Sequence, residues 1–214
     1  MSSTVPMATL RLDGGILCLD FVNTIDNRFR ESGIDYLTGY QQLLEWHDHV
    51  RVIPTKLLQT LQRLSRSYPA QATLVFEKSL QLREVLYQLF TTIISKKSPA
   101  APDLQTFNNY VTETLAHVTL IYDKGSRQGN VIFTSPVMEQ AMWWVVQSAL
   151  TLWTSDQLPL IRQCPACGWL FMDRSKNRSR KWCSMETCGG LDKVKACYER
   201  KKKQEKNNRH PLSR

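Results

Sequence analysis

The C-terminal quarter of the chain contains the stretch CPACGWLFMDRSKNRSRKWCSMETCGG, residues 164–190, in which two pairs of cysteines enclose a basic and aromatic segment. Cys164 and Cys167 form the first pair, and Cys183 and Cys188 follow after fifteen intervening residues. Two cysteine pairs separated by a loop of this length are typical of a tetrahedral metal site. The stretch is therefore predicted to fold around a metal ion.

Zinc is the ion that this ligand set favours, because four thiolates complete a tetrahedron, whereas a catalytic zinc keeps three protein ligands and an open position. We therefore expect a structural Zn²⁺ on the four cysteines. A catalytic zinc is one alternative, and His210 in the C-terminal tail is its nearest histidine in the sequence. The other alternative is four reduced thiols that pack as small apolar groups. The segment has few apolar residues, so its folding should depend on the metal.

The residues around the cysteines predict a small finger similar to a treble clef. Gly168 and Gly189 each follow the second cysteine of a pair, where positive φ would turn backbone N–H groups toward sulfur. The runs 169–173 and 180–182 are expected to pair as a hairpin. A terminal helix is predicted because apolar and long side chains continue at helical spacing. Those positions are Leu191, Val194, Lys195 and Tyr198.

The positive charge of the chain is concentrated at its C-terminal end. The net charge of the 214 residues is +9 at pH 7. Residues 1–161 carry 13 basic and 14 acidic side chains, whereas residues 162–214 carry 15 basic and 5 acidic ones. Four thiolates on a zinc ion would remove about two units of positive charge and leave this end strongly basic. Such an asymmetry indicates a polyanionic partner, of which nucleic acid fits best.

The predicted nucleic-acid contacts lie between the two cysteine pairs and directly after the second pair. They are Arg174, Lys176, Asn177, Arg178, Arg180, Lys181, Lys193, Lys195 and Arg200. If about five of these side chains meet phosphates, the logarithm of the binding constant should fall with log salt at a slope near −4 to −5. Trp169, Phe171 and Trp182 are expected to fill the core of the finger rather than stack on bases. The alternatives are a solvated basic face and a face that binds an acidic protein.

No segment has the properties of a membrane span or of a secretory signal. The most apolar run, AMWWVVQSALTLW at 141–153, is shorter than the roughly 18–20 apolar residues that a spanning helix needs. The first residues lack a basic start followed by a long apolar centre. We therefore expect a soluble cytoplasmic protein without a membrane partner, in a compartment where cysteines stay reduced.

Residues 1–160 are predicted to form a mainly helical domain with one β-hairpin. A short strand or hairpin around the Gly-Gly turn at 14–15 should lead into a first helix, and 117–136 has the pattern of a β-hairpin. The other predicted helices cover 38–50, 56–67, 72–95, 103–115 and a segment that has Pro136 in its first turn and ends near Trp153.

The first helix of this domain carries a polar stripe that is a candidate ligand site. If the helix starts at Asp20, then Asp20, Asn23, Thr24 and Asn27 share one face, and Arg28 ends the segment. These side chains would line a pocket for a small-molecule effector, or they would cap helices and anchor the Gly-Gly turn. Both readings remain open, and the residues favour the second.

No catalytic pattern accompanies these features. The sequence has no glycine-rich phosphate loop, nucleophile elbow or paired-carboxylate signature, so we expect a protein that is not an enzyme. His47, His49 and His117 are expected to be ordinary packing residues, because neither cysteines nor carboxylates accompany them at metal-ligand spacing. No pattern in the sequence indicates an oligomeric state.

The chain resembles bacterial regulators that combine an N-terminal ABATE domain with a C-terminal CGNR zinc finger, a family of stress-induced transcription regulators. The resemblance rests on LCLDFVNT at 17–24, the helical middle with its late hairpin, and the stretch 164–189. It implies that the finger binds DNA and that the N-terminal domain senses a ligand. The four cysteines match the ligand positions of the family, and residues 178–180 match its basic strand.

One departure from the family pattern affects the last cysteine. The name of the finger spells Cys-Gly-Asn-Arg, whereas this chain has Cys188, Gly189, Gly190 and Leu191. The metal ligand is retained, but an Asn and an Arg that would cap a helix or contact phosphate are absent.

Together these features predict an α+β protein with a helical domain over 1–160, a zinc finger over 161–205 and a basic, disordered tail over 206–214. Its predicted function is that of a zinc-dependent, DNA-binding transcription regulator with an effector-sensing N-terminal domain. One alternative is an adaptor whose basic finger binds an acidic protein. The other is an N-terminal domain that modifies a small molecule.

Overall fold

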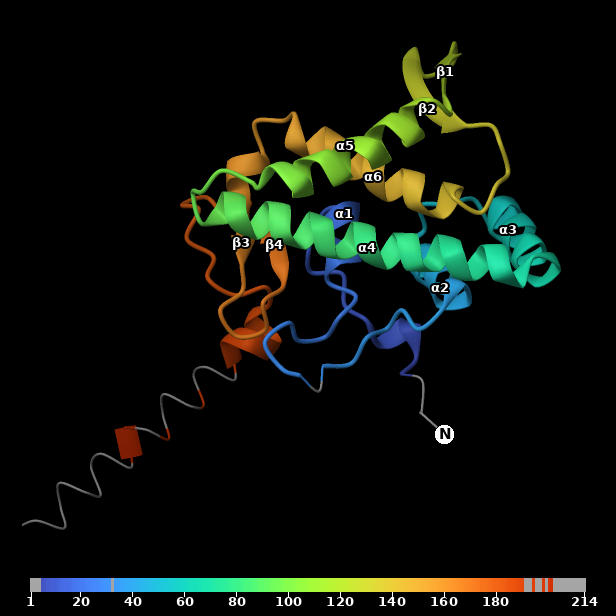
Figure 1. The fold of residues 1–214 in the computed structure, drawn as a ribbon. Helices are drawn as coiled ribbons and strands as arrows, with labels where there is room; N and C mark the ends of the chain where they lie inside the picture. Colours follow the sequence, from blue (N-terminus) through green and yellow to red (C-terminus); the bar gives the residue numbers. More distant parts are fainter. Residues whose placement is uncertain (1–4, 32, 191–193, 195–197, 199, 202–214) are drawn as a thin grey trace, which may run out of the picture.

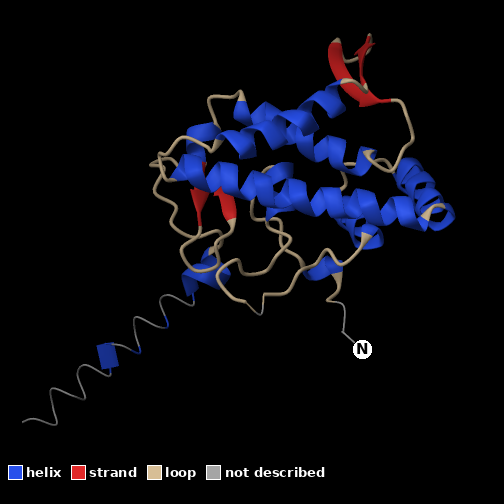
Figure 2. Cartoon of the chain, viewed as in Figure 1, coloured by secondary structure: helices blue, strands red, loops and turns tan. Residues whose placement is uncertain are grey.

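Helices dominate the N-terminal part of the chain in a computed structural model that describes residues 5–31, 33–190, 194, 198, 200 and 201 (Figure 1). In chain order the elements are η1 (Met7–Thr9), α1 (Leu17–Val22), α2 (Tyr40–Val50), α3 (Thr55–Ser67), α4 (Pro69–Ile94), α5 (Ala101–Leu115), β1 (Val118–Asp123), β2 (Gln128–Phe133), α6 (Gln140–Trp153), η2 (Leu158–Leu160), β3 (Ile161–Gln163), β4 (Leu170–Met172) and η3 (Met185–Gly189). Figure 2 shows a mainly helical chain with two small pairs of strands, which confirms the predicted α+β class. No helix in the described part of the chain is both long and apolar enough to cross a membrane.

The longest helix, α4, runs through the centre of the helical part and contacts α1, α2, α3, α5 and β3 (Figure 1). Pro69 occupies its first turn, where the missing N–H has no helical partner to lose. Leu82, Leu86 and Leu89 are fully buried and recur at helical spacing, so they form one continuous apolar stripe. The helix ends where Lys96 adopts a left-handed backbone with φ of 56°.

The short helix α1 lies inside the core, where it contacts α4 and α6. The strand or hairpin predicted before it is wrong, because no strand is present between residues 5 and 16 of the described chain. The backbone groups of Gly14 bond elsewhere: its N–H donates to the carboxylate of Asp20, and its carbonyl accepts from the N–H of Met172. A Cβ on Gly14 would lie 2.8 Å from the backbone nitrogen of Asp20, so only glycine fits this turn.

Three histidines contribute packing and hydrogen bonds within the helical part. His47 on α2 is fully buried, and its Nε2 lies 2.6 Å from the carbonyl oxygen of Ala141 on α6. Burial lowers the pKa of His47 to about 4, so the ring is neutral and its Nε2–H donates this bond. The Nε2 of His49 lies 2.8 Å from the carbonyl oxygen of Leu10. His117 stacks on a tryptophan of α6 at 4.2 Å between ring centres.

The hairpin β1–β2 confirms the prediction for 117–136, and it projects from the helical body (Figure 1). Its register pairs Val118 with Phe133 at the base and Asp123 with Gln128 near the turn. The prediction that Pro136 lies in the first turn of α6 is wrong, since α6 begins at Gln140. The side chain of Gln140 donates to the carbonyl of Phe133, so it bonds to the end of the hairpin.

Candidate metal centre and nucleic-acid interface

The four cysteines of the C-terminal segment converge on one point. Cys164 and Cys167 lie in the turn between β3 and β4, Cys183 precedes η3, and Cys188 lies within η3. All four side chains are buried, and their Sγ atoms lie within 4.8 Å of one another. The Sγ atoms of Cys167 and Cys183 are 3.6 Å apart, as are those of Cys183 and Cys188.

These separations fit a tetrahedral metal site. A zinc–sulfur bond of about 2.3 Å in a regular tetrahedron places neighbouring sulfurs about 3.8 Å apart, close to the separations found here. Among the described residues the ligand group consists of these four sulfurs alone. Four soft sulfur donors suit a closed structural site better than a catalytic site with an open position. Because the sulfurs come from two turns on different segments, an ion at their centre would join both halves of the finger.

Hydrogen bonding among the thiols sets their acidity. Bonds with Cys167 and Cys183 lower the pKa of the Cys164 thiol far below its ordinary value. The hydrogen bond with Cys164 raises the pKa of Cys167 to about 12 and also raises the pKa of Cys183. The Cys164 sulfur is therefore favoured as a thiolate while Cys167 and Cys183 hold protons, which a metal cation would displace.

The first cysteine pair lies in a tight knuckle closed by backbone hydrogen bonds. The N–H of Gly168 donates to the carbonyl of Cys164 at 2.9 Å, and the N–H of Cys164 donates to the carbonyl of Trp169 at 2.8 Å. Gly168 has φ of 78°, as predicted, and a Cβ there would lie 2.7 Å from Cβ of Arg28. The prediction of positive φ at Gly189 is wrong, because the helical turn of η3 continues through it. A Cβ at this position would lie 2.9 Å from the sulfur of Met185, an exposed and flexible side chain that can move aside, so this contact does not require glycine.

The hairpin of the finger pairs β3 with β4, not the two runs predicted from the sequence. Ile161 pairs with Met172 and Gln163 with Leu170, so the strands flank the knuckle directly. The run 180–182 does not pair with β4, because Arg180 turns back toward the second cysteine pair. The predicted terminal helix begins at Leu191, and most of its positions lie outside the described residues.

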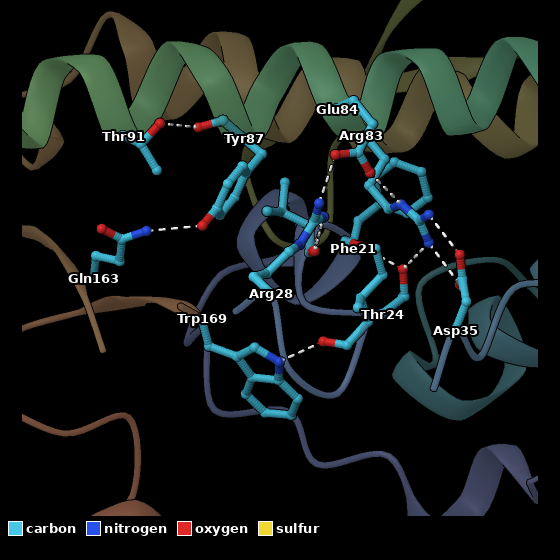
Figure 3. A network of polar contacts seen from close by, with 12 residues as sticks. Phe21, Thr24, Arg28, Asp35, Arg83, Glu84, Tyr87, Thr91, Gln163 and Trp169 are labelled. Atoms are coloured by element: carbon cyan, nitrogen blue, oxygen red, sulfur yellow. Dashed lines mark hydrogen bonds and ion pairs between the residues drawn. The ribbon is translucent and has the colours of Figure 1, made fainter. Parts of the chain in front are cut away.

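The segment after α1 holds the finger against the helical part. Asn23 is buried and bonds to both backbone groups of Leu170: its side-chain NH₂ donates to the carbonyl at 2.8 Å, and its Oδ1 accepts from the N–H at 2.9 Å. The indole N–H of Trp169 donates to the carbonyl of Ile25 (Figure 3). The backbone N–H of Arg28 donates to the carbonyl of Cys167 at 2.8 Å. The residues next to the metal ligands therefore share the core of the helical part.

The predicted nucleic-acid contacts are concentrated in the loop 174–182, which contains no acidic residue. The side chains of Arg174, Lys176, Asn177, Arg178 and Lys181 are exposed, and none of the four cations forms an ion pair within the described part of the chain. The ammonium of Lys181 lies 4.5 Å from the ring centre of a neighbouring tryptophan. Arg200 is also exposed, whereas Lys193 and Lys195 lie outside the described residues. The loop thus presents four cations on one short segment.

A buried carboxylate fixes the backbone of this loop. The Oδ1 of Asp173 accepts hydrogen bonds from the backbone N–H and the hydroxyl of Ser175 at 3.1 and 2.6 Å. Its Oδ2 accepts from the backbone N–H of Arg180 at 3.1 Å. Burial alone would raise the pKa of Asp173, but these hydrogen bonds outweigh it and lower the pKa. Asp173 therefore stays ionised and joins the two ends of the basic loop.

Arg180 differs from the other predicted contact residues. Its Nε donates to the carbonyl of Trp182 at 2.9 Å, and its Nη2 donates to the carbonyl of Cys183. The guanidinium also lies over the ring of Phe171, 4.7 Å from its centre. These contacts turn Arg180 toward the backbone beside a metal ligand. The other cations of the loop are exposed, although Arg174 donates a long hydrogen bond of 3.4 Å to Gln157 and Lys181 lies over the ring of Trp182.

Two family descriptions match the chain, in agreement with this arrangement. Residues 161–201 match the CGNR zinc finger. Residues 15–156, more than half of the chain, match ABATE, whose description is "Putative stress-induced transcription regulator". The chain belongs to the ABATE family. Comparison with curated proteins gives no match.

The departure from the CGNR pattern affects a position that tolerates a side chain. Gly190 follows η3 with φ of −65°, in the ordinary helical region. A Cβ there would meet the carbonyl oxygen of Met185 at 3.5 Å, which is an ordinary contact. The asparagine of the ABATE-associated finger would therefore fit at Gly190 without strain. Leu191, which stands at the arginine position, lies outside the described residues.

The first three candidate ligand residues of the ABATE region bond to the protein itself. The buried carboxylate of Asp20 accepts the N–H of Gly14 at 2.8 Å, and burial raises its pKa to about 7. Asn23 bonds to the finger, as described above. The hydroxyl of Thr24 donates to the carbonyl of Phe21 and accepts from Arg83 at 3.0 Å (Figure 3). These contacts favour the structural alternative over a ligand pocket.

Arg28, the last candidate, is part of a charged network that joins the same segment to α4 (Figure 3). Its guanidinium donates to the carboxylate of Glu84 and to the carbonyl of Val22, both at 2.6 Å, and lies 4.3 Å from the ring centre of Tyr87. Glu84 also accepts from Arg83 at 3.1 Å. The two buried guanidinium groups thus share a carboxylate, which offsets the cost of their desolvation.

Two residues on which the site depends have partners other than those predicted from the sequence. Asp173 ends the run 169–173 that is predicted to be a strand, although an Asp with a Ser two positions later is a local signal for a side-chain-bonded turn. Asn23 is predicted to bind a ligand or to cap a helix, whereas its partner is the backbone of Leu170, 147 positions away. Only the folded chain reveals such a distant pairing.

Proposed function

We propose that this ABATE-family protein is a zinc-dependent transcription regulator that binds DNA through the loop 174–182. The converging thiolates would hold Zn²⁺ as a structural ion, and zinc would fix the two turns of the finger relative to each other. The helical part would receive a small-molecule effector. In this proposal the protein binds its partners and does not catalyse a reaction.

The observation that carries the proposal is the basic loop and its anchor. Asp173 joins both ends of the loop through three hydrogen bonds, and the side chains of Arg174, Lys176, Arg178 and Lys181 remain in solvent. A row of cations on an anchored backbone beside the metal ligands is suited to phosphate contacts, because the backbone that carries them needs little reorganisation on binding. The absence of acidic residues from the loop leaves these cations available for an anionic partner.

A salt titration on duplex DNA tests the proposal. With about five phosphate contacts, the logarithm of the binding constant should fall with log salt at a slope near −4 to −5. The double substitution Lys176→Ala and Arg178→Ala should retain the metal and reduce the slope by about 2. The control is Lys124→Ala with Arg127→Ala, which removes two exposed cations from the turn of the β1–β2 hairpin. It should leave the slope unchanged.

The outcome also separates DNA binding from the adaptor alternative. Addition of a strong chelator should abolish DNA binding together with the metal, because the loop is anchored next to the ligands. Absent or salt-insensitive DNA binding by the metal-loaded chain would contradict the proposal and favour an acidic protein as the partner. An unchanged slope in the Lys176→Ala, Arg178→Ala variant would place the contact surface elsewhere.

A further inference from the structure

A cavity of about 440 Å³ lies where the C-terminal end of α4 meets the segment that enters the finger. Its apolar walls come from both sides of this junction. They are Ile93 and Ile94 of α4, Leu158 and Pro159 of η2, and Ile161 at the start of β3. Cavities of roughly 300 to 1,000 Å³ with mostly apolar walls are the usual sites for small organic ligands.

Two cations flank these walls, and no carboxylate is among the described residues that line the cavity. Lys96 directly follows α4, is exposed, and makes no ion pair among the residues that the structure describes. Arg162 is half-buried, and its Nη1 donates to the carbonyls of Pro159 and Ile161 at 2.7 and 3.0 Å. Those two bonds hold the guanidinium in place beside the cavity while its other nitrogens remain available to a ligand.

Two sources of negative charge near the cavity, Asp173 and the C-terminal end of α4, are already hydrogen-bonded. Asp173 attracts Arg162, but its oxygens accept the N–H groups and hydroxyl of the basic loop described above. The last turn of a helix carries partial negative charge that would oppose an anion. At the end of α4, the backbone N–H groups of Ser95, Lys96 and Lys97 donate to the carbonyls of that turn. The two cations therefore dominate the charge at the cavity.

We propose that this cavity binds a small organic anion with an apolar body, such as an aryl carboxylate or a medium-chain alkyl carboxylate. The apolar walls would accept the body of the ligand, and Lys96 and Arg162 would bind its anionic group. The binding proposal is independent of DNA binding. A role of the bound anion as the effector of a transcription regulator rests on the function proposed above.

The position of the cavity gives such a ligand access to the finger. Ile161 and Arg162 belong to β3, which leads directly into Cys164. Two positions beyond Ile161, the side chain of Gln163 donates to the hydroxyl of Tyr87 on α4 at 2.8 Å (Figure 3). A ligand that contacts both α4 and β3 would therefore change the packing between the helical part and the strand that leads to the metal ligands.

A pair of matched dyes tests the proposal on the full-length, metal-loaded protein. 1-Anilinonaphthalene-8-sulfonate has an apolar body and one negative charge, and N-phenyl-1-naphthylamine has the same rings without the charge. The charged dye should bind with a fluorescence increase, and decanoate should displace it. Neutral dye that binds as tightly as the charged dye would overturn the proposal, because the two cations would then contribute nothing.

Variants locate the binding site. Lys96→Gln and Arg162→Gln should each weaken the charged dye about threefold or more, the effect of losing one partly exposed charge pair, and should leave the neutral dye unaffected. Two controls address other surfaces: Lys176→Gln with Arg178→Gln in the basic loop, and Leu120→Ser with Tyr122→Ser on the exposed hairpin. Neither control should change binding. Full affinity in both cavity variants, or loss of affinity only in a control, would overturn the proposal.

Discussion

Replacement of Asn23 by alanine should separate the finger from the helical part. The side chain of Asn23 bonds to both backbone groups of Leu170 in a buried position, as the backbone of a neighbouring strand would do. Alanine would leave a buried N–H and a buried carbonyl unpaired, at about 1–3 kcal/mol each. We therefore expect a loss of about 2–6 kcal/mol in the free energy of unfolding.

Chemical denaturation of the metal-loaded chain measures this loss, and release of the metal to a colorimetric chelator gives a second readout. A loss of about 2 kcal/mol raises the population of the opened finger about 30-fold, and the chelator should extract the metal correspondingly faster. Asn27→Ala is the matched control, because within the described chain the Asn27 side chain accepts a single, exposed backbone N–H, that of Phe29. Equal stability and equal release rates in Asn23→Ala and Asn27→Ala would refute the role assigned to Asn23.

Four further predictions concern the site and the core. Cys183→Ser should lose the metal and unfold the finger, as seen by metal analysis and circular dichroism, and full retention of metal would contradict the ligand assignment. Asp173→Ala should weaken DNA binding with metal content unchanged, because the basic loop loses three hydrogen bonds. An unchanged binding constant for DNA would show that the Asp173 carboxylate is not needed to hold the loop. Arg180→Ala should lower the melting temperature of the metal-loaded chain more than Arg178→Ala does, because the Arg180 side chain bonds to the carbonyls of Trp182 and Cys183. Equal losses of melting temperature would argue against those contacts. Asp20→Asn should remove a pH dependence of stability. The folded pKa of Asp20 is raised to about 7, above its unfolded value, so wild-type stability falls between about pH 4 and pH 7 as the buried group ionises. Identical profiles of stability against pH in the two proteins would contradict this assignment.

The parts of the fold that were predictable from the sequence depend on contacts between near neighbours in the chain. The helical stripe of α4, the turn between β1 and β2, and the spacing of the cysteines are local patterns, and each appears in the structure near its expected position. The predicted packing of Trp169 and Phe171 in a core is also confirmed, since both side chains are buried, whereas Trp182 is only half-buried and packs against that core. Their apolar character was sufficient for that prediction.

The parts that were not predictable depend on pairings between distant segments. Residues around Gly14 have the alternating pattern of a strand, yet their backbone bonds to the finger and to α1. The run 180–182 has the residue types of a strand, but hydrogen bonds from Arg180 to the backbone beside Cys183 prevent it from pairing. The polar stripe from Asp20 to Arg28 suits either a ligand or the protein itself, and only the positions of Leu170 and Glu84 favour the second role.

The metal content of the reduced, purified chain tests the central claim most directly. Elemental analysis should find about one zinc ion per chain. Substitution with Co²⁺ should produce the absorption of a tetrahedral tetrathiolate site. A chain that contains no transition metal, and whose residues 161–190 nevertheless remain folded, would contradict the account.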